Sequence, residues 1–257
     1  MRSRWASVLI ALGLSGALAA AQTPTLASRA KAATAILVAQ TESGGMNVLC
    51  TSTAFEKKGK RYHFVSAAHC VGSDNVTKEK SADGSKTSFY VTFDETVVKA
   101  YFAAKPIYVG YQHRGDDFSV FEVLVKDREG KEIDPQWETI PLGDEGKEVE
   151  GNTLINPASP LGLGVQLFRG SISSLFLDRP VIQGDINWHG AMLIQMPGSE
   201  GGSSGSALIS ESQSAIIGFL VGTIGNSVTA IPVSRFKDFL QKSREGTYRW
   251  EMKAEDQ

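Results

Sequence analysis

The chain has 257 residues, 42% hydrophobic and 21% charged, which is an ordinary composition for a globular protein with a substantial core. Its formal net charge of −2 at pH 7 argues against a nucleic-acid-binding protein, which usually carries a basic surface. The 26 glycines indicate many tight turns, as in proteins built from short β-strands.

Residues 1–21 are typical of a signal peptide. Arg2 and Arg4 give a positive start, an apolar stretch follows over residues 8–18, and small residues precede a cleavage position before Gln22. A retained membrane anchor is the alternative, but the apolar stretch is shorter than the ~20 residues of a membrane span. We therefore expect a secreted or periplasmic protein that is not attached to a membrane after signal cleavage.

After a flexible lead-in at residues 22–34, short apolar runs recur between polar, turn-forming stretches. Their length and their Gly- and Asp-rich borders favour β-strands over helices. The runs form a first β-unit at 35–125 and a second unit at 140–243, joined by a charged linker at 126–139. A polar tail follows at 244–257. The sequence thus predicts an all-β protein with two sheet units.

One helix is predicted, at the end of the second unit. Ser234 is suited to cap it, because a serine side chain accepts hydrogen bonds from the N–H groups of a first helical turn. Phe236, Phe239 and Leu240 follow at helical spacing on one face. We expect this helix to close the fold.

A serine flanked by glycines is the first candidate for catalysis. A serine hydroxyl becomes a nucleophile when a base takes its proton, and its loop must point N–H groups at the developing oxyanion. Gly202 and Gly205 permit such a turn around Ser204, with the N–H groups of Gly202 and Ser204 as the oxyanion donors. Taken alone, this stretch also fits a flexible Gly/Ser surface loop.

A histidine and an aspartate of the first unit complete a candidate triad. His69 follows a strand-like run and precedes Cys70, and the other histidines lack comparable surroundings. Asp117 precedes an apolar strand, where a buried carboxylate could accept from the imidazole N–H and stabilise the imidazolium. Asp116 is a direct rival for this role, since turn aspartates are common.

The two cysteines, Cys50 and Cys70, are expected to form a disulfide in an exported protein. Such a bridge would hold the loop of His69 against a neighbouring strand. Two unpaired, buried thiols are the alternative. Two cysteines and one adjacent histidine offer too few ligands for a zinc site, so we expect no metal and no cofactor.

Together these segments resemble the trypsin-like serine peptidases. AAHC ending at Cys70, the apolar stretch after Asp117 and GSSGSAL around Ser204 stand in the order and rough spacing of that family. The likeness covers about residues 35–243 and is greatest to bacterial Htr/Deg-type proteases, without a PDZ-type domain, and to glutamyl-endopeptidase-like secreted enzymes. It implies two six-stranded antiparallel β-barrels with a C-terminal helix and an active site between the barrels.

The resemblance implies a serine endopeptidase that cleaves a protein or peptide substrate through an acyl-enzyme. Ser204 would attack the peptide carbonyl, His69 would transfer the proton and Asp117 would orient the imidazole. A non-catalytic binding module on the same fold is the alternative function. An esterase of the α/β-hydrolase type would need its serine before its histidine in the chain, which is the reverse of this order.

By the same resemblance, the specificity pocket has its base at Gly198 and its opposite wall at Val221, Gly222 and Thr223. None of these residues is charged, and a basic substrate side chain would be desolvated there without an ion pair. We expect cleavage after small or medium uncharged residues, unless Glu200 faces the pocket.

The residue before the nucleophile is Ser203, where the family usually has Asp or Asn. An N-terminal ammonium released by cleavage would find no anion there, and burying it unpaired would be strongly unfavourable. We therefore expect local hydrogen bonds to order the oxyanion loop, with the Ser203 hydroxyl as a candidate donor. The protein should then be active once its signal peptide is removed, without a further proteolytic step.

Overall fold

The computed structural model describes residues 23–40, 45–71, 88–93, 101–112, 115–183 and 186–248. The expected signal peptide at 1–21 lies outside these ranges, and the polar tail is described only to Tyr248. Within these ranges, no helix is both long enough and apolar enough to cross a membrane.

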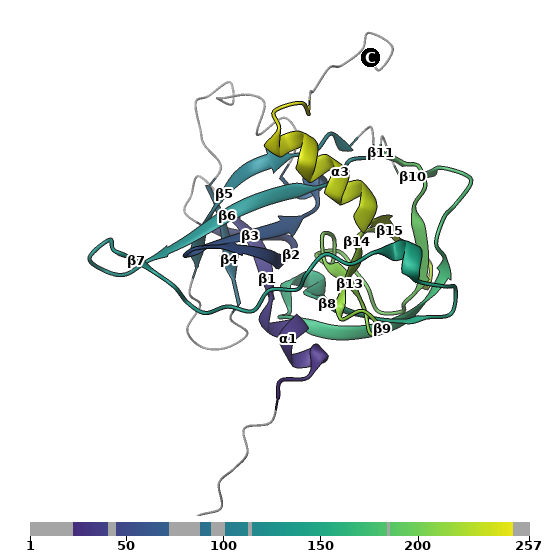
Figure 1. Cartoon of the computed structure of the whole chain (residues 1–257), viewed down its shortest axis with the longest axis horizontal. Coiled ribbons are helices and arrows are strands. Elements are labelled where there is room, and N and C mark those ends of the chain that lie inside the picture. The colour runs from purple at the N-terminus through teal and green to yellow at the C-terminus, as the bar shows by residue number, and fades with distance from the viewer. Residues whose placement is uncertain are drawn as a thin grey trace, which may run out of the picture.

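Strands dominate the chain, with short helices near its two ends (Figure 1). The strands are β1 (Thr34–Gln40), β2 (Met46–Lys58), β3 (Arg61–Ser66), β4 (Ser88–Thr92), β5 (Phe102–Val109), β6 (Ser119–Lys126), β7 (Glu132–Ile133), β8 (Thr153–Ala158), β9 (Gln166–Ser174), β10 (Val181–Gln183), β11 (Ile186–Trp188), β12 (Met192–Gln195), β13 (Ala207–Ser210), β14 (Ala215–Ile224) and β15 (Ser227–Pro232). The helices are α1 (Leu26–Ala32) and α3 (Val233–Arg244), with 3-10 turns η1 (Ala68–Cys70), η3 (Glu145–Lys147) and η4 (Pro160–Gly162).

The first barrel is formed by β1 to β6. Its sheet runs in the order β3-β2-β1-β4-β5-β6, and antiparallel pairing of β3 with β6 closes it. Leu37, Phe64 and Phe121 are fully buried members of its core. Their alternation with outward-facing neighbours is the pattern expected of barrel strands.

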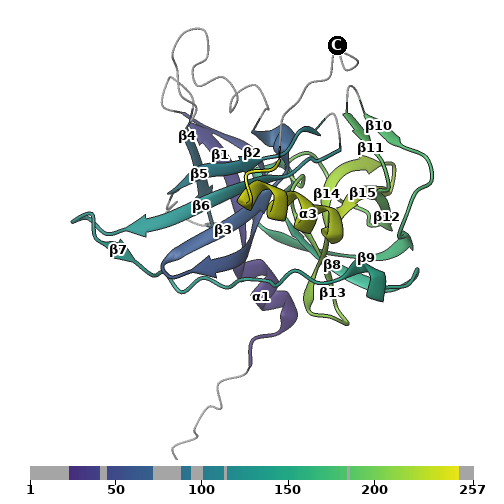
Figure 2. The same ribbon diagram turned by 45° about the horizontal axis from the view of Figure 1, so that its top comes forward.

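The second barrel is closed by β12-β15-β14-β13-β8-β9, all paired antiparallel. Leu154, Ile194, Leu208 and Ile217 are fully buried in its core. Figure 2 shows the two barrels side by side, with α3 near their junction. The predicted all-β fold of two six-stranded barrels with a C-terminal helix is confirmed.

The prediction of a flexible lead-in at 22–34 is wrong, because α1 and the first residue of β1 fall within it. Thr25 caps α1 by accepting a hydrogen bond from the backbone N–H of Ser28. Ala30 and Ala33 are fully buried, and α1 contacts β1, β8 and β9. The alanine-rich stretch is small enough to pack tightly here and favours a helix.

The linker expected at 126–139 joins the barrels and is itself partly built into the first one. Its strand β7 pairs with the end of β6. The Trp137 ring packs against the rings of Tyr62 and Phe102 at centroid distances of 5.1 and 4.9 Å. The polypeptide between the barrels is therefore anchored by aromatic contacts.

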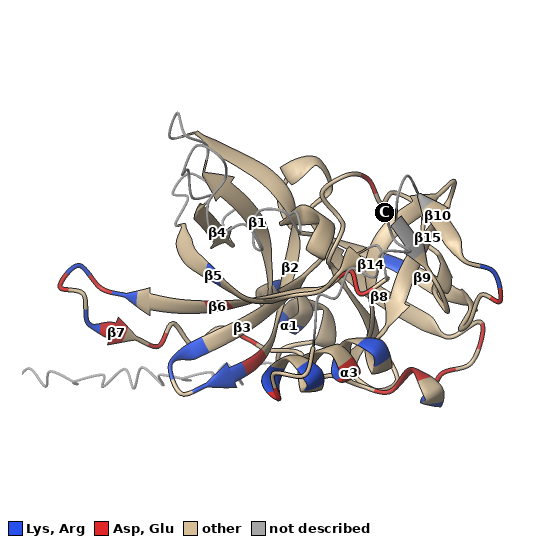
Figure 3. Cartoon of the chain, turned by 90° about the horizontal axis from the view of Figure 1, so that it is seen from above, with Lys and Arg blue, Asp and Glu red and all other residues tan. Residues whose placement is uncertain are grey.

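Helix α3 fastens the two barrels together. Its Phe236 ring contacts Phe55 of β2 at 5.3 Å, Phe118 before β6 at 5.1 Å and Phe219 of β14 at 4.9 Å. The predicted burial of Phe236, Phe239 and Leu240 is confirmed. Charged residues lie along α3 and on the β6–β7 turn (Figure 3).

The predicted helix cap is wrong by two residues. Helix α3 starts at Val233 with Pro232 in the capping position and no side-chain cap. Ser234 lies inside the first turn, where its backbone N–H donates to Glu145 Oε2 at 3.1 Å. A carboxylate from η3 therefore binds an N–H group that a serine cap would otherwise have satisfied.

Candidate active site

His69 lies on the turn that follows β3. The strand is buried over its last residues, and Ala68 of η1 is fully buried, which anchors the turn to the core. Ser119 Oγ donates to the carbonyl of Ala67 at 3.0 Å and ties the same turn to β6. The His69 side chain remains 26% exposed at the end of this anchored segment.

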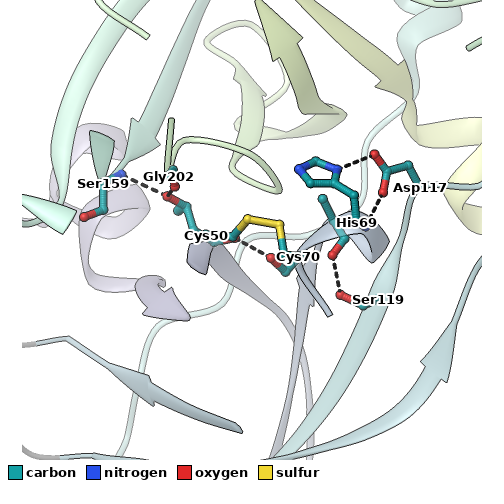
Figure 4. Close-up of a disulfide and its surroundings, with 10 residues drawn as sticks. Cys50, His69, Cys70, Asp117, Ser119, Ser159 and Gly202 are labelled. Atoms are coloured by element: carbon teal, nitrogen blue, oxygen red, sulfur yellow. Dashed lines mark hydrogen bonds and ion pairs between the residues drawn. A yellow bond between two sulfur atoms is a disulfide. The ribbon is translucent and has the colours of Figure 1, made fainter. Parts of the chain in front are cut away.

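The carboxylate of Asp117 holds His69 by two hydrogen bonds (Figure 4). Oδ2 lies 2.7 Å from His69 Nδ1, and Oδ1 accepts from the His69 backbone N–H at 2.8 Å. The Asp117 side chain is fully buried. Because a carboxylate only accepts, Nδ1 carries the imidazole hydrogen in this pair, which leaves Nε2 free to act as a base.

The neighbouring carboxylate of Asp116 points to other partners. Its Oδ1 lies 2.9 Å from Arg235 Nε, and its Oδ2 accepts from the Tyr248 hydroxyl at 3.1 Å. Asp116 thus connects the loop before β6 to α3 and the residues after it. Of the two candidate acids, Asp117 is the one that contacts the imidazole of His69.

Ser204 and His69 border the same cavity, whose volume is about 340 Å³. Its lining residues are His69, Trp188, Glu200, Gly201, Ser204, Leu220, Val221, Gly222 and Thr223. Within the described part of the chain, no hydrogen bond joins the Ser204 and His69 side chains. Catalytic hydrogen bonds are often long in unliganded enzymes and tighten when substrate binds.

The loop before Ser204 is a tight turn with unused donors. The Ser203 N–H donates to the Glu200 carbonyl at 3.0 Å, and Gly202 has φ 95°, as the third residue of a type II turn requires. Among the described residues, no hydrogen bond uses the N–H of Gly202 or of Ser204. Unoccupied N–H groups beside a serine are what an oxyanion hole needs.

Gly205 brings this loop into close contact with the first barrel. Its φ is 80°, and a Cβ atom there would lie 2.5 Å from the Ala67 backbone nitrogen. Only glycine fits both the backbone conformation and the space. The loop of Ser204 therefore packs directly against the residues that precede His69.

The Ser203 hydroxyl, one candidate donor for ordering the oxyanion loop, does not fill that role in the described structure. Ser203 is fully buried, and its Oγ has no hydrogen-bond partner among the described residues. The loop is instead bound through its backbone carbonyls, by Thr51 on Gly202 and by Leu161 on Gly201.

The expected specificity residues divide into two groups. Val221, Gly222 and Thr223 line the cavity beside Ser204, as does Glu200. Gly198 is exposed and is not among the lining residues. A Cβ atom at Gly198 would lie 3.1 Å from the Phe168 ring, so an aromatic side chain occupies the space beside the expected pocket base.

Trp188 and Leu220 are lining residues that the sequence did not single out. Both are almost fully buried; Leu220 comes from an ordinary apolar run, and Trp188 stands between Asn187 and His189. Nothing in a short apolar run marks one member as lining a cleft, because the cleft arises only when β11 and β14 meet the first barrel.

The predicted disulfide between Cys50 and Cys70 is confirmed, with Cα atoms 6.1 Å apart. It joins β2 to η1, directly beside His69 (Figure 4). One potential ligand atom from each of Cys50, Cys70 and His69 lies within 4.8 Å of the others. Both sulfurs are used in the bridge, so this cluster offers no thiolates to a metal.

Residues 50–219 match the family model described as a trypsin-like peptidase domain. The match includes His69, Asp117 and Ser204. A search of curated protein sequences gives no significant match.

Three solved proteases illustrate the structural likeness. The HtrA-type protease AlgW with a decapeptide superposes with a TM-score of 0.63 at 15% identity, over 86% of this chain and 67% of AlgW. Deg5 gives 0.58 at 18% identity, over 83% and 89% of the two chains. An inactive form of Rv3671c from M. tuberculosis H37Rv gives 0.58 at 14% identity, over 87% and 92%. At such identities the likeness is one of fold.

Proposed function

Because the chain belongs to the trypsin-like peptidase family, we propose that it is a serine endopeptidase with Ser204 as nucleophile, His69 as base and Asp117 as the acid that orients His69. The observation that carries the proposal is the fully buried Asp117 carboxylate bound twice to His69, beside a serine that borders the same cavity. A histidine with only a structural role would not require a buried carboxylate on its imidazole and a serine at the same cavity.

In the proposed mechanism, His69 acts first as a base and then as an acid in each half-reaction. His69 Nε2 takes the Ser204 proton as Oγ attacks the peptide carbonyl, and the N–H groups of Gly202 and Ser204 bind the oxyanion. His69 then protonates the leaving amine. Water then attacks the acyl-enzyme as His69 takes its proton, and His69 returns that proton to Ser204 Oγ as the ester bond breaks; Asp117 takes no proton itself. The residues present supply every proton transfer in this scheme.

We propose a protein or peptide substrate that reaches the enzyme outside the cytoplasm. AlgW, a protease of the same fold, was solved with a decapeptide, which supports a peptide as the substrate. The location is inferred from the signal-like residues 1–21.

For the residue before the cleaved bond, we propose a small or medium uncharged side chain. Trp188, Leu220 and Val221 give the cavity apolar walls, and Glu200 is the one carboxylate among its described lining residues. Cleavage of a diverse peptide library would test this. Predominant cleavage after Arg or Lys in the wild type, lost in Glu200→Gln, would assign the specificity to that carboxylate.

A fluorophosphonate probe tests the function directly, since only an activated serine reacts with it. The chain beginning at Gln22 should be labelled and should hydrolyse fluorescein-labelled casein. Ser204→Ala should lose both properties while its melting temperature is retained. A folded wild-type protein that binds peptides but is never labelled would favour the non-catalytic binding module.

A further inference from the structure

Thr51 of β2 connects the first barrel to the nucleophile loop of the second barrel. Its backbone N–H donates to the Ser204 carbonyl at 3.0 Å, and its hydroxyl donates to the Gly202 carbonyl at 2.8 Å. The residue is fully buried. One side chain therefore binds the turn that carries the proposed oxyanion donors.

The direction of this hydroxyl is set by a third contact. The Ser159 backbone N–H, just before η4, donates to Thr51 Oγ at 2.9 Å. Because the oxygen already accepts there, its own hydrogen is available for the Gly202 carbonyl. The Thr51 carbonyl accepts from Ser66 Oγ at 2.7 Å, which fixes the backbone of β2 at the same point.

The two carbonyls inside the turn are both held from outside it. Leu161 N–H donates to the Gly201 carbonyl at 2.7 Å, and Thr51 holds the Gly202 carbonyl. In a planar trans peptide, the C=O and the following N–H point in opposite directions. Binding the Gly201 carbonyl therefore directs the Gly202 N–H away from Leu161. Binding the Gly202 carbonyl orients the next peptide, which places the Ser203 N–H on Glu200.

These contacts matter because Gly201 and Gly202 are adjacent glycines, whose peptides rotate more freely than those of other residues. A rotated Gly201–Gly202 peptide would withdraw the Gly202 N–H from the oxyanion position. The buried Ser203 hydroxyl, which has no partner among the described residues, does not oppose that rotation.

We propose that Thr51 is a positioning residue that presets the oxyanion turn through its hydroxyl. The proposal rests on the serine endopeptidase function proposed above, and it explains how the turn is ordered with an uncharged residue at Ser203. The Thr51 hydroxyl acts on the reaction only through Gly202.

Two pairs of variants isolate the hydroxyl. Wild type and Thr51→Val have side chains of nearly the same shape and differ by the hydroxyl. Thr51→Ser and Thr51→Ala both lack the methyl group and likewise differ by the hydroxyl. Thr53→Val is the matched control, since Thr53 lies on the same strand, is fully buried and has a hydroxyl without a partner in the described structure.

We expect Thr51→Val and Thr51→Ala to slow fluorophosphonate labelling and casein hydrolysis by roughly 10- to 100-fold, as small displacements of catalytic groups do. Thr51→Ser should retain most of the rate, and Thr53→Val should match wild type. Casein hydrolysis rates are divided by the concentration of sites that the probe finally labels. All assays are run well below the melting temperature of each variant. Hydrogen exchange of the peptide covering residues 200–206 should be faster in Thr51→Val than in Thr53→Val.

Equal labelling rates in folded Thr51→Val and wild type, with unchanged exchange at 200–206, would overturn the proposal. So would equally slow Thr51→Ser and Thr51→Ala variants, because the methyl group would then be responsible. If Thr51→Val fails to fold, the Ser and Ala pair decides. A wild-type protein that is never labelled refutes the endopeptidase function instead. The hydrogen-exchange comparison of Thr51→Val with Thr53→Val still tests whether the Thr51 hydroxyl orders the turn.

Discussion

At the residue scale, two adjacent aspartates have separate roles that only their surroundings distinguish. Asp117 is fully buried on His69, whereas the Asp116 side chain is 21% exposed and pairs with Arg235. The sequence left both open because each precedes the same apolar strand. The Phe118 N–H donates to the Asp116 carbonyl at 2.9 Å, so the chain turns tightly here and the two side chains reach different partners.

Asp117→Asn should lower kcat by about 10⁴-fold, because an amide cannot fix the imidazole tautomer or stabilise its charge. Asp116→Asn should keep kcat within a few-fold, because Asp116 contacts α3 rather than the imidazole. Steady-state hydrolysis of fluorescein-casein measures both variants. The reverse ranking would transfer the acid role to Asp116.

A second buried acid, Glu148, stabilises the second barrel without contacting the cleft. It is 4% exposed and accepts from Ser210 Oγ at 2.6 Å and from Asn152 Nδ2 at 2.8 Å. Although burial raises the pKa of Glu148, these hydrogen bonds and one from Gln213 lower it below its usual value. The carboxylate is thus bound as an anion.

Glu148→Gln should reduce the free energy of unfolding at pH 7 by about 1–3 kcal/mol, because an amide cannot accept all of these bonds. Since the folded pKa is lowered, the contribution of Glu148 is present above the unfolded value of 4.5 and is lost as pH falls through the folded pKa. Urea unfolding at pH 7 and in acid measures this. A wild-type advantage that grows on acidification would contradict it.

At the element scale, the disulfide joins the two segments that the proposed chemistry depends on. Cys50 precedes Thr51, whose hydroxyl holds the Gly202 carbonyl of the oxyanion turn. Cys70 follows His69 of the proposed triad. The bridge therefore holds β2 close to η1, where His69 and the oxyanion turn lie near each other.

Replacing both Cys50 and Cys70 by alanine should reduce the free energy of unfolding by roughly 3 kcal/mol, as expected for a loop of this size. Fluorophosphonate labelling should also slow, because both flanking segments gain freedom. Urea unfolding and labelling rates measure the two effects. Wild-type protein treated with reductant, with free thiols verified by mass spectrometry, is the control, and an unchanged unfolding midpoint would refute the prediction.

The sequence predicted the elements with strong local signals better than those defined by long-range contacts. The apolar face of α3, the disulfide and the two barrels followed from spacing and from the family motifs. The helix α1 was missed, since Ala30 and Ala33 read as a small-residue tail until they pack against β8 and β9. Thr51 was missed for the same reason, because its partners lie on segments about 110 and 150 residues away.

At the scale of the whole molecule, the proposed catalytic groups come from different barrels, and α3 packs across the barrel junction. The Phe236 ring contacts Phe55 of the first barrel and Phe219 of the second. Removing this ring leaves a cavity at the junction, with loss of both transfer energy and packing.

Phe236→Ala should therefore reduce the free energy of unfolding by about 3–5 kcal/mol. Lys242→Ala is the control on the same helix. It removes an exposed ion pair with Asp238, and exposed ion pairs contribute little to stability. Urea unfolding compares the variants, and equal midpoints would show that α3 does not hold the barrels together.

The last prediction concerns activation of the whole chain. The residue before the proposed nucleophile is uncharged, and the oxyanion turn is held by Thr51 and Leu161, so no contact among the described residues requires a defined N-terminal ammonium. Two recombinant forms, beginning at Gln22 with and without an added Gly-Ser, should therefore be equally active.

A form beginning at Ala35 is not a fair comparison. It lacks α1, whose Ala30 is fully buried, and it should melt at a lower temperature. Labelling rates and melting curves measure both effects. An inactive extended form that gains activity only when trimmed to one defined N-terminus would show that an activation cleavage orders the turn.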